Sequence, residues 1–211
     1  MTIASMPRRD AERQQARSSQ PRLVVVSYAA HAPFSPRGIR TRELLERLQD
    51  EWTIELVARP SAAGSTGGAH RPVRSLIRRA GRRVHSALLF DKYELWSRRR
   101  FRSWSPDADG ALLIAFPFSP VFYASRRLAE RQIPFVVDAG DPWVLTGADP
   151  AVSGAALARA RTAERQLWAT AAGAILTTEA QARALSALFP HLKLLVRPNG
   201  FAPGSRARLT P

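Results

Sequence analysis

The chain has 211 residues, 45% of them hydrophobic and 23% charged, which is typical of one globular domain. It contains no cysteine, which excludes disulfides and thiolate metal sites. The net charge of +15 favours attraction to polyanions, although all but two of the 32 basic residues are arginine, as a GC-rich genome would also give.

The chain opens with a polar segment, and strand and helix patterns follow it. Residues 1–21 lack the apolar core of a secretory signal and are predicted to form a disordered basic tail, so we expect a cytoplasmic protein. The valine-rich run 22–28 predicts a strand buried on both faces. A loop over 31–38, an amphipathic helix over 39–48 and a strand over 53–58 complete a βαβ unit.

Strand and helix patterns continue to alternate along the rest of the chain. Further strands are predicted over 111–116, 134–137, 173–176 and 193–196, and helices over 73–88, 93–104, 121–131, 155–171 and 178–188. This order predicts an α/β fold, a Rossmann-like doubly wound parallel sheet that binds ligands at the carboxyl ends of its strands.

Several common functional motifs are absent from the sequence. No G-x-G-x-x-G follows the first strand and no G-x-x-x-x-G-K-[ST] occurs, which argues against dinucleotide enzymes and P-loop NTPases. The four histidines are scattered at no metal-ligand spacing, so no metal and no cofactor is expected.

The loop after the first strand is the first candidate site. Gly38 allows a ligand to approach the backbone closely. The N-terminus of the following helix suits a phosphate or carboxylate, to which Arg37 and Arg40 can add bidentate hydrogen bonds. An ordinary βα turn with a convenient glycine explains the same residues.

Two carboxylates near the end of the 134–137 strand form the second candidate site. Asp138 and Asp141 flank Gly140 and are candidates for general-base work. The alternative is that Asp138 caps a turn and Asp141 starts one with Pro142. Asn199, in an Asn-Gly turn after the last strand, carries no functional information alone.

Six segments, taken in order, resemble the N-terminal domain of family 4 glycosyltransferases, which is one half of the GT-B fold. They are residues 35–40, 91–96, 116–120, 133–143, 164 with 171–178, and 196–201. The segment 133–143 is the best match, because it is similar to the P-x-V-x-D-x-R-D-P-W pattern of one branch. It departs from that pattern at Gly140, where the branch usually has arginine, and Gly38 stands alone where many members have two glycines.

The resemblance implies a sugar-transfer function for a domain spanning residues 22–201. Such a domain holds a lipid-linked or polysaccharide acceptor, and a second domain holds the nucleotide-sugar donor, usually without a metal. The resemblance places Asp141, with Asp138, near the reacting sugar as catalytic residues. The expected substrate-binding residues are Arg37, Gly38, Arg40, Phe118, Ser119, Trp143 and Asn199.

The donor half has no counterpart in this sequence. No E-x₇-E motif of the donor domain follows Gly200, and residues 202–211 resemble no linker. We therefore expect the chain to need a donor-domain partner chain for catalysis, whether it is a gene fragment, a remnant or one subunit of a split enzyme.

The basic stretch 71–105 holds eleven basic residues and two acidic ones, interleaved with aromatic side chains. Family members that use lipid-linked acceptors often dock on membranes through such a helix, which implies peripheral binding to the inner face of the plasma membrane. The residues expected on this surface are Arg74, Arg78, Arg79, Arg82, Arg83, Arg98 and Arg99.

Two other interpretations of the basic stretch stay open. A solvated helix face explains the same arginines without any partner. The alternative function is a non-catalytic binding or assembly module that keeps the fold and uses the basic surface for a membrane or a protein partner. No specific nucleic-acid binding is expected, because no known RNA-binding signature is present.

Overall fold

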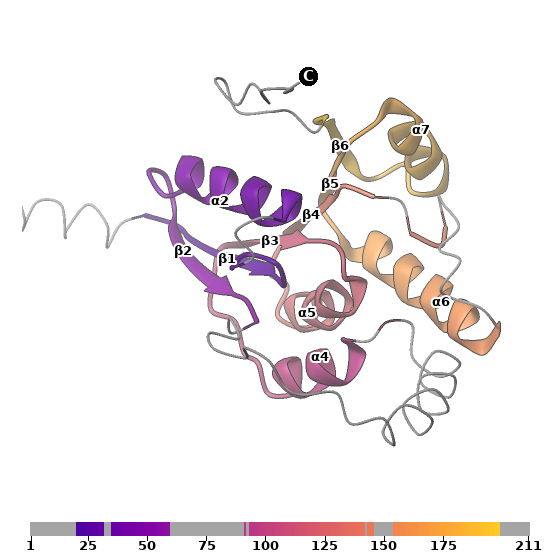
Figure 1. Cartoon of the computed structure of the whole chain (residues 1–211), viewed down its shortest axis with the longest axis horizontal. Helices are drawn as coiled ribbons and strands as arrows, with labels where there is room; N and C mark the ends of the chain where they lie inside the picture. Colours follow the sequence, from indigo (N-terminus) through magenta and orange to yellow (C-terminus); the bar gives the residue numbers. More distant parts are fainter. Residues whose placement is uncertain are drawn as a thin grey trace, which may run out of the picture.

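The computed structural model describes residues 20–31, 35–59, 91, 93–141, 143–145 and 154–198. Strands and helices alternate along these residues (Figure 1). The strands are β1 (Arg22–Ser27), β2 (Thr53–Val57), β3 (Gly110–Ile114), β4 (Phe135–Ala139), β5 (Gly173–Leu176) and β6 (Lys193–Val196). The helices are α2 (Pro36–Leu48), α4 (Glu94–Phe101), α5 (Phe118–Glu130), α6 (Gly154–Thr170) and α7 (Glu179–Leu188).

The six strands form one parallel sheet in the order β2-β1-β3-β4-β5-β6. The chain runs outward from β1 to β2 and then returns to build β3 on the other side of β1. The expected α/β fold with a Rossmann-like parallel sheet is therefore confirmed. The direction of winding reverses between β1 and β3, which is where such sheets bind ligands.

Helices cover the two faces of the sheet unequally (Figure 1). On one face, Leu44 of α2 packs with Val25 and Leu112 in a small apolar cluster. The opposite face carries the main core, to which α4, α5, α6 and α7 contribute side chains such as Phe101 and Leu167. Within the described residues, α2 is thus the helix that separates the sheet's second face from solvent.

Two helices begin earlier than the sequence predicted. Helix α2 begins at Pro36 and α5 at Phe118, so Gly38 and Pro120 lie inside first turns instead of in loops. Proline is tolerated there, because the first N–H groups of a helix have no partner within it. Strand β4 also extends beyond its predicted end, and it includes Asp138, which pairs with Ile114 of β3.

Some predicted features lie outside the described residues. They are most of the N-terminal tail, the helix over 73–88, the tail 202–211, and Asn199, Arg74, Arg78, Arg79, Arg82 and Arg83. Among the helices that are described, none combines the length and the apolar character required to cross a membrane.

Candidate functional site

An open cavity of about 270 Å³ lies where the carboxyl ends of β3 and β4 meet the start of α2. It therefore sits beside the reversal point of the sheet, the expected ligand position in this architecture. Its lining residues are Ser35, Arg37, Arg40, Ile114, Ala115, Asp138, Gly140 and Asp141.

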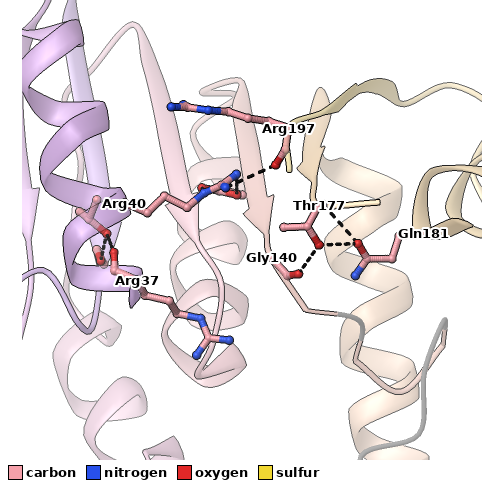
Figure 2. Close-up of polar contacts among 9 residues, drawn as sticks. Arg37, Arg40, Gly140, Thr177, Gln181 and Arg197 are labelled. Atoms are coloured by element: carbon pink, nitrogen blue, oxygen red, sulfur yellow. Dashed lines mark hydrogen bonds and ion pairs between the residues drawn. The ribbon is translucent and has the colours of Figure 1, made fainter. Parts of the chain in front are cut away.

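The first turn of α2 is fixed against the end of β1. The buried Thr41 hydroxyl donates to the Arg37 carbonyl oxygen at 2.7 Å and lies 3.2 Å from the Ser27 hydroxyl oxygen. This contact holds the helix so that Arg37 and Arg40 both extend from α2 toward the end of β4 (Figure 2).

Arg40 and Asp138 form a bidentate ion pair at the wall of the cavity. Arg40 Nε lies 2.9 Å from Asp138 Oδ2, and Arg40 Nη2 lies 3.0 Å from Oδ1. The Asp138 side chain is only 1% exposed, and Arg40 also donates to the carbonyl oxygen of Arg197 at 3.4 Å (Figure 2). Both oxygens of Asp138 are thus engaged, so this carboxylate ties α2 to the sheet.

The neighbouring pair, Arg37 and Asp141, is more accessible. Arg37 Nη2 donates to Asp141 Oδ2, and the Asp141 side chain is 56% exposed. The Arg37 guanidinium lies over the Phe116 ring, 4.1 Å from its centroid, as in a cation–π contact. Burial lowers the pKa of Arg37 from its ordinary value, and the negative charge of Asp138 opposes this shift. Asp141 is therefore the carboxylate of the site that a ligand can reach.

The turn between β4 and Asp141 is held by residues that follow β5 (Figure 2). The Thr177 hydroxyl donates to the Gly140 carbonyl oxygen at 2.6 Å, and the Gln181 side-chain oxygen accepts from the Thr177 N–H at 3.2 Å. Gln181 also completes a capping box with Thr178 at the start of α7. The position of Asp141 thus depends on β5 and α7 as well as on β4.

Behind Asp141, the segment 143–145 is held by the buried carboxylate of Glu164 on α6. Glu164 Oε2 accepts from the N–H groups of Val144 and Leu145 at 2.9 and 2.8 Å, and Oε1 accepts from Trp168 Nε1 at 3.2 Å. Burial raises the pKa of Glu164, and these hydrogen bonds oppose the shift. Glu164, one of the residues on which the family resemblance rests, thus shapes the loop after β4 through these contacts.

Phe118 and Trp143 pack beneath the site instead of lining the cavity. Their rings stack with centroids 4.3 Å apart and an interplanar angle of 4°, and each residue is 3% exposed. Ser119 is also buried, and its backbone N–H donates to Asp91 Oδ2 at 2.8 Å. Burial raises the pKa of Asp91, and its bonds with Ser119 oppose the shift. These three residues thus support the start of α5 and the loop after β4.

The structure brings together four of the residues singled out from the sequence, namely Arg37, Arg40, Asp138 and Asp141. Gly38 is buried within the first turn of α2 and is not a lining residue. Arg98 and Arg99 lie on α4, which packs on the other face of the sheet. Whether any of these residues binds substrate stays a prediction.

Sequence reasoning missed Phe116 as part of this site. Phe116 follows β3, has a φ of 73° and leaves 44% of its surface exposed beneath Arg37. A bulky side chain in the left-handed region costs roughly 1–2 kcal/mol, and such residues cluster at functional sites. Only its position next to Pro117 at the end of a buried strand could have drawn attention to it.

The chemistry available here is that of an accessible carboxylate beside arginines. No group of three or more histidine, aspartate or glutamate side chains suited to a metal occurs among the described residues. Asp141 can accept a proton from a hydroxyl, and Arg37 can hold an anionic group.

No protein-family model and no curated protein sequence matches this chain. The chain is thus established as a single α/β domain with a six-stranded parallel sheet.

Proposed function

We propose that the chain is the acceptor-binding half of a GT-B glycosyltransferase that moves a sugar from a nucleotide-sugar to an acceptor. One observation carries the proposal: an accessible carboxylate, Asp141, faces Arg37 in a cavity beside the reversal point of a parallel sheet. The six ordered segments that resemble family 4 glycosyltransferases support it as well.

In this proposal the two aspartates have different roles. Asp141 acts on the acceptor or the reacting sugar, because its carboxylate is exposed to the cavity. Asp138 positions α2, because both of its oxygens bind Arg40 and its side chain is 1% exposed. Arg37 exchanges Asp141 for an anionic group of the ligand, which leaves Asp141 free to accept a proton.

Gly140, which stands where the related glycosyltransferase branch usually has arginine, is compatible with the proposal. A Cβ atom added at Gly140 would meet only the Thr177 side chain, at 3.8 Å, which is ordinary van der Waals contact. Contacts at the Cβ position therefore do not demand glycine at residue 140.

Calorimetry followed by a transfer assay tests the proposal. The purified chain is titrated with UDP-glucose and GDP-mannose, alone and after mixing with the donor domain of a family 4 enzyme. We expect no tight binding by the chain alone, and release of UDP or GDP by the mixture when lipid and polysaccharide extracts are added as acceptors. The proposal is wrong if neither mixture releases nucleotide above the rate of the donor domain alone.

A second candidate function rests on the basic surface. The last turn of α4 carries Arg98, Arg99 and Arg100, and the exposed Leu95 lies on the same helix. A binding or assembly module that docks on an anionic membrane or a protein partner would use such a surface without any sugar transfer. In that case the Asp141→Asn variant would dock as well as the wild type does.

A further inference from the structure

A second concave region lies between α4 and α5, away from the site described above. This groove has a volume of about 370 Å³, within the range of about 300–1,000 Å³ that small-molecule sites occupy. Helix α5 starts at the carboxyl end of β3 and runs back toward the amino ends of the strands, so the groove, near its last turns, lies at the opposite end of the sheet. Its lining residues are Arg98, Phe101, Arg102, Tyr123, Arg126, Arg127 and Glu130.

The groove carries an excess of positive charge. Of the described residues, four arginines and one glutamate line it, which leaves three positive charges unbalanced among them. The buried Glu94 lies 2.7 Å from Arg98 and 2.6 Å from Arg159 of α6. Including both Glu94 and Arg159 in the count leaves the balance unchanged, because the one negative charge offsets the one additional positive charge. An anion with two or more charges would therefore be attracted here.

Two of the arginines are held in place by fixed acceptors. Arg98 binds the fully buried Glu94 and donates from Nε to the Tyr123 hydroxyl oxygen at 2.7 Å. Arg127 donates from Nε to the Phe101 carbonyl oxygen at 2.9 Å, and it also donates to Arg102 O and Glu130 Oε2. Arg127 thereby occupies carbonyl oxygens at the end of α4, whose negative partial charge would otherwise repel an anion.

The other two arginines are available to a ligand. Arg102 and Arg126 are exposed, and among the described residues no hydrogen bond or ion pair engages the guanidinium group of either one. The hydrogen bond from Arg127 reaches only the backbone carbonyl oxygen of Arg102. Arg126 has only a distant contact with the Phe122 ring, at 6.0 Å from the centroid. Guanidinium groups with free N–H pairs bind phosphate in a bidentate manner, which neutral or lysine side chains cannot reproduce.

We propose that the groove between α4 and α5 binds a phosphate-bearing anion through Arg102 and Arg126, on a floor fixed by Arg98 and Arg127. The binding group is a pyrophosphate or a comparable cluster of phosphates, because three unbalanced charges exceed what a monoanion neutralises. This site is independent of the sugar-transfer proposal, because it shares no residue with the cavity at the carboxyl ends of the strands.

Calorimetry with inorganic pyrophosphate at constant ionic strength tests the proposal on the full chain. The test variant is R102A/R126A, and the matched control is R47A/R161A, which removes two exposed arginines from α2 and α6. We expect the test variant to bind at least about tenfold more weakly than the wild type, and the control to stay within about twofold. Equal melting temperatures of the three proteins would show that all of them fold.

A second arm of the experiment distinguishes a free phosphate from a lipid headgroup. Vesicles of phosphatidylglycerol are sedimented with each protein, with and without pyrophosphate. If R102A/R126A loses vesicle binding while the control variant keeps it, and pyrophosphate competes with the vesicles for the wild type, the ligand is a lipid headgroup. If R102A/R126A binds vesicles as well as the wild type does, the ligand is a soluble phosphate compound. The proposal is overturned if the wild type does not bind pyrophosphate, or if both variants weaken its binding equally.

Discussion

The cavity beside Asp141 and the groove between α4 and α5 differ in how their arginines are neutralised. In the cavity, Arg37 pairs with Asp141 and Arg40 pairs with Asp138, so the charges within each pair cancel. The result is a polar cavity without excess charge from these four side chains. Around the groove, one buried carboxylate, Glu94, serves two arginines, and three positive charges stay unbalanced. The first arrangement suits a neutral or singly charged substrate with a hydroxyl to activate, and the second suits a polyanion.

The largest effect is expected on the groove side, at Glu94. The Glu94→Ala variant removes a fully buried carboxylate that joins α4, α5 and α6 through Arg98, Tyr123 and Arg159. We expect the free energy of unfolding, measured in urea, to fall by roughly 3 kcal/mol. The matched change of an exposed glutamate, Glu130→Ala, should cost less than about 0.5 kcal/mol. Similar losses in the two variants would show that Glu94 does not hold these helices together.

The next effect separates the two aspartates of the cavity. Asp138→Ala removes the bidentate ion pair with Arg40, whose side chain is 13% exposed, and we expect a loss of roughly 2 kcal/mol in unfolding free energy. Asp141→Ala removes an accessible carboxylate and should change stability by less than about 0.5 kcal/mol. Urea denaturation of both variants measures the difference. A larger loss for Asp141→Ala would reverse the roles given to these residues.

Glu164 gives an intermediate effect with a defined pH dependence. Because burial raises its pKa, the folded chain keeps the proton to a higher pH than the unfolded chain does, and stability falls as pH rises through that interval. Glu164→Gln replaces one acceptor by a donor that faces other donors, and should cost roughly 1–2 kcal/mol. The advantage of the wild type over the variant should be largest near pH 4 and decline as pH rises. An advantage that grows with pH would contradict the assignment.

The smallest effect is expected at Gly140. Because a Cβ atom at this position would make only an ordinary van der Waals contact, we expect Gly140→Arg to shift the melting temperature by only one or two degrees, equivalent to less than about 0.5 kcal/mol. A drop of many degrees in differential scanning calorimetry would mean that the turn before Asp141 requires glycine.

The sequence predicted every described strand, because apolar runs of strand length are bounded by polar or proline-containing segments. It misplaced the starts of α2 and α5, since a proline in the first turn of a helix looks locally like a loop. The pairing of Arg40 with Asp138 joins residues 98 positions apart, and no local pattern indicates which arginine meets which aspartate.

The candidate site was predictable only in part. Asp138 and Asp141 stood out as polar residues at the end of a buried strand. Their different burial and their different arginine partners separate their roles, and neither burial nor pairing can be read from the local sequence. Phe116 stayed hidden because its contact with Arg37 arises from its backbone conformation and from the packing of α2. The groove between α4 and α5 combines two helices whose proximity the sequence does not encode locally.

The most direct test of the central claim compares two aspartate-to-asparagine variants in the transfer assay. Asp141→Asn removes the accessible carboxylate of the cavity, and Asp50→Asn makes the same change at an exposed residue just after α2. In the mixture with a donor domain, we predict that Asp141→Asn lowers the rate of nucleotide release at least about a hundredfold, as expected for loss of a general base. Asp50→Asn should leave that rate unchanged. Equal rates in both variants would contradict the claim that Asp141 performs the chemistry of this site.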